Sequence, residues 1–212
     1  MIGAGLHYSR YRVGDRDEWM MRIGSGPALL FLPPLFEEMN RTRALLAAVM
    51  RILAGEGYGC FLPDLPGTGE SERALEEVSW QDWLAAAAAA AEACGPIAAV
   101  SLRGGALLDE PVRRRWRFAP ATGASLARDL ARAGLMTEGG GGGYAPSAAL
   151  LAALGSAEPV TGADVRTVRL ATDRAEADLK LDGPPLWRRA EPQTSSELTE
   201  AIASDISRWV RA

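Results

Sequence analysis

The chain has 212 residues, of which 48% are hydrophobic and 24% are charged, and its formal net charge is −4. This composition is that of an ordinary folded domain and excludes a largely disordered chain, so we predict one domain over residues 1–212. The positive charge is almost all arginine and is scattered among acids, which argues against nucleic-acid binding.

One arginine-rich stretch departs from this even distribution. It follows Asp109 and Glu110 and comprises Arg113, Arg114, Arg115 and Arg117. Because two acids directly precede it, we interpret it as a solvated helix end rather than a nucleic-acid site.

The cysteines and the longest apolar runs indicate the cellular compartment of the protein. Cys60 and Cys94 lie in apolar contexts without the spacing of metal ligands, so we expect reduced core residues, no metal and no cofactor. The N-terminus lacks a long apolar run, and the alanines at 85–91 are too few to span a bilayer. We therefore predict a cytoplasmic protein without a membrane span.

The first half of the chain predicts a hairpin followed by alternating strands and helices. Residues 8–13 and 18–23 alternate polar and apolar around a Gly-Asp turn, which is typical of an antiparallel hairpin. The apolar runs at 28–34 and 58–63 predict buried strands. Between them we expect a helix capped by Asn40 or Thr42 and ended by Gly55. Ser79 begins a second helix at 80–93.

The second half continues the alternation. We predict strands at 97–100, 116–119, 165–170 and 179–181, and helices from Ala106, at 124–133 and at 195–210. Strands that alternate with helices predict a mostly parallel sheet covered on both faces. The five glycines at 139–143 predict a loop, because no helix carrying Lys and Ser or Thr follows to make a phosphate cradle. Residues 135–164 are the only place for a lid or a loop remnant of one.

The chain is organised around residues 97–108, IAAVSLRGGALL. A short buried strand, a turn of small residues and the start of a helix form the layout of the nucleophile elbow, G-x-S-x-G. The pattern places Ser101 and Gly105 at the flanking small positions and Arg103 at the tip. A guanidinium stays protonated at biological pH and cannot attack a carbonyl.

These elements resemble the α/β-hydrolase fold, of which the segment GYGCFLPDLPGTGES at 57–71 is a recurrent signature. More narrowly, several segments resemble the hydrolase-like proteins associated with exosortase systems, which sort surface proteins in polysaccharide-producing bacteria. They are PPLFEEMNRTR at 33–43, the pair Trp80 and Trp83, residues 116–130, GGYAPSAAL at 142–150 and GPPLW with EP at 183–192.

The resemblance implies a catalytic triad that this sequence does not complete. Hydrolases of this fold use a serine at the elbow, an acid after a later strand and a histidine near the last helix. Asp173 matches the acid, but Arg103 stands at the elbow and Trp187 stands where the histidine is expected. The only histidine, His7, lies in the predicted hairpin, so we expect no Ser-His-Asp catalysis.

The remaining pocket should lie beyond the carboxyl ends of the strands, where open α/β sheets bind ligands. The candidate ligand-binding residues are Arg103, Gly104, Leu35, Asn40 and Trp187. Backbone N–H groups of Leu35 and Gly104 could form an anion nest, and Arg103 could hold a carboxylate or phosphate with two hydrogen bonds.

Each of these residues also has a structural interpretation. Arg103 could instead pair internally with Glu37, Glu38 or Asp109. The two glutamates lie near the N-terminus of the predicted helix and could complement its dipole, Asn40 could cap that helix, and Trp187 could be a core aromatic. The sequence leaves these alternatives open.

Three functional hypotheses follow. The first is a non-catalytic or accessory binding protein of an exosortase or exopolysaccharide system, acting on a small anionic ligand or a protein partner. The second is a hydrolase or transferase in which Glu37, Glu38 or Asp173 is the general base and Arg103 clamps an anionic substrate; it predicts a carboxylate within about 4 Å of Arg103 with a raised pKa. The third is a structural homodimer that associates through an edge strand or the final helix.

Overall fold

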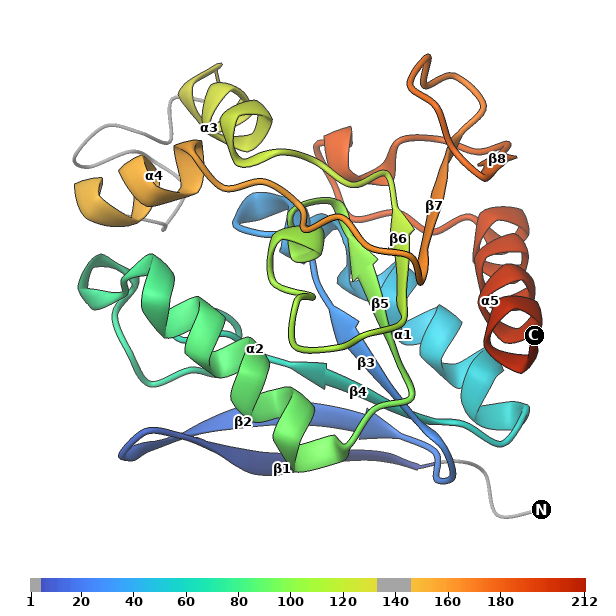
Figure 1. Cartoon of the computed structure of the whole chain (residues 1–212), viewed down its shortest axis with the longest axis horizontal. Helices are drawn as coiled ribbons and strands as arrows, with labels where there is room; N and C mark the ends of the chain where they lie inside the picture. Colours follow the sequence, from blue (N-terminus) through green and yellow to red (C-terminus); the bar gives the residue numbers. More distant parts are fainter. Residues whose placement is uncertain (1–4, 133–145) are drawn as a thin grey trace.

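The computed structural model describes residues 5–132 and 146–212, and its centre is one eight-stranded sheet in the order β1-β2-β4-β3-β5-β6-β7-β8 (Figure 1). The strands are β1 (Leu6–Val13), β2 (Arg16–Ile23), β3 (Ala28–Leu32), β4 (Gly59–Pro63), β5 (Ala98–Leu102), β6 (Arg115–Phe118), β7 (Val165–Leu170) and β8 (Leu179–Leu181). All neighbours from β4 to β8 pair in parallel, whereas β1 pairs with β2 and β2 with β4 in antiparallel register. The predicted mostly parallel sheet with an N-terminal antiparallel hairpin is confirmed.

Helices cover both faces of the sheet, as the alternation predicted. The α-helices are α1 (Glu37–Gly55), α2 (Trp80–Cys94), α3 (Gly123–Arg132), α4 (Ala148–Gly155) and α5 (Ser196–Arg211). Figure 1 shows α1 and α5 together on one side of the sheet and α2 across the other. Short 3-10 helices, η1 (Leu75–Glu77), η2 (Arg103–Leu107) and η3 (Leu186–Arg188), lie in the connections.

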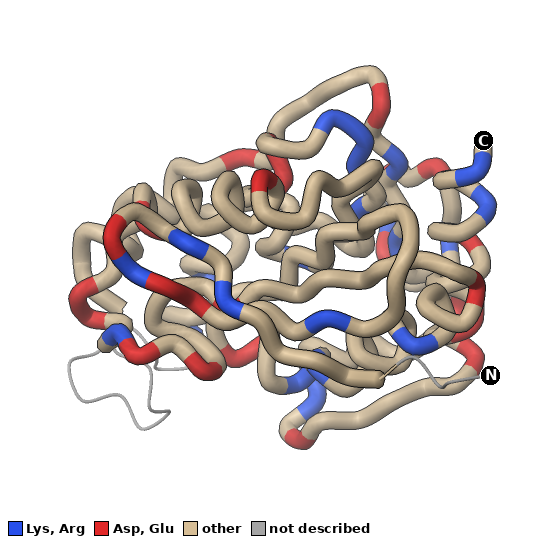
Figure 2. The backbone as a smooth tube through the Cα atoms, turned by 90° about the horizontal axis from the view of Figure 1, so that it is seen from below, with Lys and Arg blue, Asp and Glu red and all other residues tan. Residues whose placement is uncertain are grey.

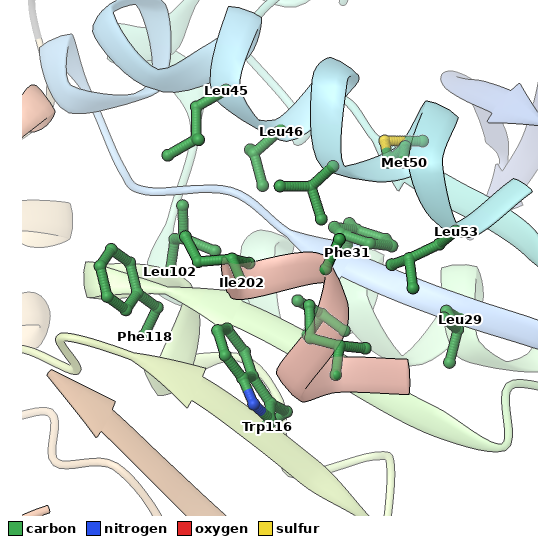
Figure 3. Packing of buried hydrophobic residues seen from close by; sticks show 14 of the residues in the cluster. Leu29, Phe31, Leu45, Leu46, Met50, Leu53, Leu102, Trp116, Phe118 and Ile202 are labelled. Atoms are coloured by element: carbon green, nitrogen blue, oxygen red, sulfur yellow. The ribbon is translucent and has the colours of Figure 1, made fainter. Parts of the chain in front are cut away.

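Two apolar clusters, one on each face, hold these layers together. Figure 3 shows part of the first, in which Leu46 and Met50 of α1 meet Phe31 of β3 beside Ile202 of α5 and Trp116 of β6. The second cluster joins α2, α3 and α4 to the opposite face. Burying a large apolar side chain stabilises the fold by about 1.5–3 kcal/mol. These clusters therefore supply most of the free energy that holds the helices against the two faces of the sheet.

The start of α1 differs from the prediction. The helix begins at Glu37, with Phe36 at the N-cap in the left-handed region (φ 57°), so Asn40 and Thr42 lie inside its first turns and do not cap it. The Thr42 hydroxyl donates to the backbone oxygen of Glu38 at 2.8 Å instead. The chain leaves β3 through two prolines and then turns sharply at Phe36, which starts the helix earlier than its apolar periodicity indicated.

The arginine-rich stretch is not a solvated helix end, so that interpretation is wrong. Arg115 and Arg117 are buried in β6, and Arg114 donates to the last carbonyl groups of α5 at Trp209 and Val210. Only Arg113 has the expected exposed side chain. Figure 2 shows basic and acidic positions mixed over the rest of the described backbone.

The predicted α-helix from Ala106 is also wrong. The elbow continues only as the 3-10 helix η2, and the chain then runs through residues 108–114 to β6. Two adjacent glycines, Gly104 and Gly105, disfavour helix, and Pro111 cannot continue one. The side chain of Asp109 is moreover held by β6, as described below.

The segment that could hold a lid is only partly described. Residues 146–164 contain α4, whose Leu150 and Leu154 are buried against the neighbouring helices. The glycines at 139–143 lie outside the described residues.

Among the helices that are described, none is both long and apolar enough to cross a membrane.

Candidate functional site

The elbow after β5 keeps its strained backbone. Arg103 has φ 52°, in the left-handed region that a non-glycine residue occupies at a cost of about 1–3 kcal/mol. A Cβ at Gly105 would lie 2.3 Å from the backbone oxygen of Leu32, so only glycine permits this close approach to β3. The sharp turn that the sequence predicted after β5 is therefore present, with Arg103 at its tip.

The guanidinium of Arg103 forms a bidentate ion pair with Glu38. Its Nε lies 3.0 Å from Oε2 and its Nη2 lies 2.9 Å from Oε1 of Glu38. The two side chains are only 9% and 15% exposed. Asp129 lies 3.6 Å from the same Nη2, and the guanidinium also stacks over the ring of Trp187 at 5.1 Å. Of the three internal partners that the sequence left open, the structure selects Glu38.

Glu38 is a carboxylate in an unfavourable environment. Burial raises the pKa of Glu38 above its ordinary value, because the hydrogen bond and charge of Arg103 only partly offset the loss of solvent, and Asp129 adds repulsion. The strong hydrogen bonds to Arg103 and the raised pKa thus coexist at one position. This carboxylate is within the distance of Arg103 that the catalytic hypothesis required.

Asp109 forms a buried ion pair with a different arginine, Arg117. Its side chain is 0% exposed; it accepts hydrogen bonds from Ser101 Oγ at 2.7 Å and from Arg117 Nη2 at 2.7 Å and Nε at 2.8 Å. Arg115 lies 3.8 Å away. Ser101 is the first flanking position of the elbow, so this buried cluster fastens the elbow to β6.

Two cavities open beside Arg103, and both are lined by Trp187 and Arg188. The first has a volume of about 390 Å³, and its other walls include the apolar side chains of Leu35, Leu126 and Leu130. Its charged lining residues are Glu37, Glu38, Arg41, Asp129, Arg132 and Arg188. The second has a volume of about 320 Å³, and its charged lining residues are Arg103, Asp173, Arg174 and Arg188.

The structure gathers most of the predicted site residues here. Leu35, Glu37, Glu38 and Trp187 line the first cavity, and Arg103, Asp173 and Trp187 line the second. Two residues do not join them. Asn40 is exposed on α1 and lines neither cavity, and Gly104 is buried under the side chains of Leu35 and Leu126.

Asp173 lies after β7, where the acid of a triad would be, but it is already occupied. It pairs with Arg169 at 2.8 Å and accepts the N–H of Ala175 at 3.0 Å. Burial opposes its ionisation, but these two bonds outweigh the effect, so the pKa of Asp173 is lowered. Asp173 is thus paired with Arg169 of β7 and not with an imidazole.

His7 lies far across the sheet from these groups. It is exposed on β1, and β2, β4 and β3 separate that strand from β5. Leu186 and Trp187 stand in η3 at the sequence positions where the resemblance implied a histidine, and both are buried. Within residues 5–132 and 146–212, no group of three or more His, Cys, Asp or Glu side chains is arranged to hold a metal ion.

The sequence pattern missed five charged residues of the two cavities: Arg41, Asp129, Arg132, Arg174 and Arg188. Arg41 is one turn after Glu37 on α1, and this spacing was the only signal that could have found it. The others come from α3, from the loop after β7 and from η3, which the fold brings together and no local motif links.

Comparisons with known proteins identify the fold. No family model and no curated protein matches the chain. A predicted hydrolase from Agrobacterium vitis S4 is similar over 98% of this chain and 99% of its own, with 17% identity and a TM-score of 0.59. An epoxide hydrolase from Vigna radiata matches 53% of this chain with 16% identity and a TM-score of 0.43, and one from Solanum tuberosum matches 54% with 20% identity and a TM-score of 0.44.

The similarity to the Agrobacterium structure extends over the whole of both chains, and with the sheet order it defines an α/β-hydrolase fold. The chain spans only 39% and 40% of the length of the two epoxide hydrolases. At 17% identity the Agrobacterium structure establishes the fold alone, and the chemistry has to be argued from the site.

Proposed function

We propose that this protein is an α/β-hydrolase-fold binding protein without serine-hydrolase chemistry. The observation that carries the proposal is the ion pair between Arg103 and Glu38 at the tip of the elbow. The position that holds an attacking hydroxyl in a hydrolase holds a neutralised cation here, and Trp187 occupies the place of the base. Cavities remain on both sides of that pair, and they are what the fold offers to a ligand or partner.

We further propose that it serves as a cytoplasmic accessory protein of an exosortase or exopolysaccharide system. The support is the position of the segments that resemble such proteins. Residues 33–43 supply Glu37, Glu38 and Arg41, residues 116–130 supply Leu126 and Asp129, and residues 183–192 supply Trp187 and Arg188. The resemblance therefore falls on the cavity walls as well as on the core.

The proposal is tested with a fluorophosphonate probe, which reacts with activated serines. We expect no stoichiometric adduct by intact-mass measurement and no turnover of short-chain aryl esters above the buffer rate. A serine labelled in full, with esterase activity lost when that serine is replaced, would overturn the proposal. A serine hydrolase with a complete triad is the positive control.

A second candidate function is catalysis by carboxylate. Its support is the raised pKa of Glu38, which suits a general acid or base at a cavity wall, with Arg103 beside it for an anionic substrate. Glu37 and Asp173 are the other candidate bases. This function predicts that Glu38→Gln abolishes hydrolysis of an anionic ester, whereas Glu56→Gln on the far end of α1 does not. Absence of any turnover in the unmodified protein rejects it.

A third proposal concerns self-association. β1 ends the sheet, and its Leu6 and Tyr8 are 47% and 45% exposed. An unpaired edge with apolar side chains favours pairing with a second copy. Sedimentation equilibrium should then show a dimer that Leu6→Lys weakens and that Ile97→Lys, at another exposed apolar position, leaves intact. A monomer at all concentrations would reject it.

A further inference from the structure

The arginines of the two cavities differ in whether a protein acceptor already engages them. Arg103 pairs with Glu38, Arg132 pairs with Asp129, and Arg41 donates to the backbone oxygen of Trp187 at 3.2 Å. Arg174 and Arg188 form no side-chain hydrogen bond or ion pair with any residue in the described part of the chain. Among the residues that the structure describes, these two guanidinium groups therefore have no acceptor that competes with a ligand.

The second cavity, which these two arginines line, has an excess of positive charge. Its charged lining residues are three arginines and Asp173, and Asp173 is paired with Arg169. Thr172 adds a hydroxyl donor to the same lining. A carboxylate or a phosphate is the ligand group that satisfies arginine donors with two parallel hydrogen bonds.

The first cavity has a different lining, and that lining indicates what the rest of the ligand is. Leu35, Leu126 and Leu130 give it apolar walls, whereas Glu37, Glu38 and Asp129 repel an anion. Arg188 and Trp187 line both cavities, so the two cavities adjoin at these residues. An anionic end belongs in the second cavity and an apolar body in the first.

We propose that Arg174 and Arg188 bind the carboxylate or phosphate end of a small amphiphilic molecule whose apolar part lies against Leu35, Leu126 and Trp187. The inference deepens the proposed binding function and rests on it. It moves the anion site from Arg103, which Glu38 neutralises, to two residues after β7 and in η3. Arg103 then serves as part of the wall of the second cavity.

Calorimetric titration of the full chain with octanoate, octyl phosphate, neutral octanol and inorganic phosphate tests this inference. We expect both octyl anions to bind, octanol to bind at least tenfold more weakly, and inorganic phosphate to bind more weakly than octyl phosphate. Across a series of carboxylates the affinity should rise about three- to fourfold for each added methylene. Equal binding of octanol and octanoate, or of the two phosphates, would overturn the inference, as would no binding by any probe.

Matched variants locate the site. Arg174→Gln and Arg188→Gln should each weaken binding of octanoate about tenfold or more, whereas Arg189→Gln, at an exposed neighbour that lines neither cavity, should bind as the unmodified protein does. All three positions are exposed, so unchanged thermal unfolding is expected for each. Equal affinity of the three variants would overturn this inference alone, while a fluorophosphonate-labelled serine would overturn only the proposed function.

Discussion

Two ion pairs flank the same elbow, and they differ in what surrounds them. Asp109 with Arg117 is sealed inside the fold, with the hydroxyl of Ser101 as a further partner. Glu38 with Arg103 has comparable geometry but borders two cavities and has Asp129 close by. The first pair connects the elbow to the sheet, and the second lies at the tip of the elbow beside the cavities. Similar bonds thus serve structure at one position and shape a site at the other.

The largest effect should come from breaking the sealed pair. Asp109→Ala leaves Arg117 buried without its carboxylate and should lower the free energy of unfolding by about 3–5 kcal/mol. Urea denaturation measures this loss. The matched control is Asp17→Ala, which breaks the exposed pair with Arg12 and should cost less than about 1 kcal/mol. Similar losses for both variants would contradict the structural role assigned to Asp109.

Restoring a serine at the elbow should have a smaller effect on stability and none on chemistry. Arg103→Ser leaves Glu38 without its cation, but the neighbouring cavity admits water, so we expect a loss of about 1–3 kcal/mol. No imidazole is near to activate the new hydroxyl, so ester turnover should stay at the buffer rate. Measurable burst kinetics from this variant would mean that a base has been overlooked.

The sign of pH dependence separates the cavity pair from another buried carboxylate, Asp205. Burial opposes ionisation of Asp205, but bonds from Arg166 and Trp116 outweigh it and its pKa is lowered. The contribution of Asp205 to folding stability is present above its ordinary pKa of about 3.9. It is lost as the pH falls through the lower pKa that Asp205 has in the folded protein. For Glu38 the folded pKa is raised, so its contribution is present below the ordinary value and is lost as the pH rises through the folded one.

Asp205→Asn should therefore become less destabilising in acid, whereas Glu38→Gln should become less destabilising as the pH rises. These changes in the unfolding free energy are the smallest effects expected. They are measured by urea denaturation of both variants and the unmodified protein between about pH 3 and pH 8. Parallel pH slopes for the two variants would show that burial of Glu38 does not dominate its ionisation.

Local patterns predicted the fold because they reflect local physics. Period-two alternation predicted the hairpin, and the need for a small residue at Gly105 follows from the close approach to β3. The apolar run also predicted the strand at 116–119, which corresponds to β6 (Arg115–Phe118). The charge of the arginine-rich stretch concealed instead that Arg115 and Arg117 are buried within that strand.

The site was only partly predictable. The partner of Arg103 depends on where α1 begins, and the positive φ of Phe36 fixes that start without a sequence signal for it. Arg174 and Arg188 line one cavity because the chain after β7 and the turn at η3 converge, and neither segment carries a motif. Nonlocal contacts of this kind follow from tertiary packing and not from spacing along the chain.

The central claim is that the residue at the elbow tip is bound into an internal ion pair, and a double-mutant cycle tests it most directly. Unfolding free energies of Arg103→Met, Glu38→Gln and the double variant give the coupling between the two side chains. We predict a coupling of about 1–3 kcal/mol at neutral pH. Additive effects, within about 0.5 kcal/mol, would contradict the claim and return Arg103 to the list of groups free to bind a ligand.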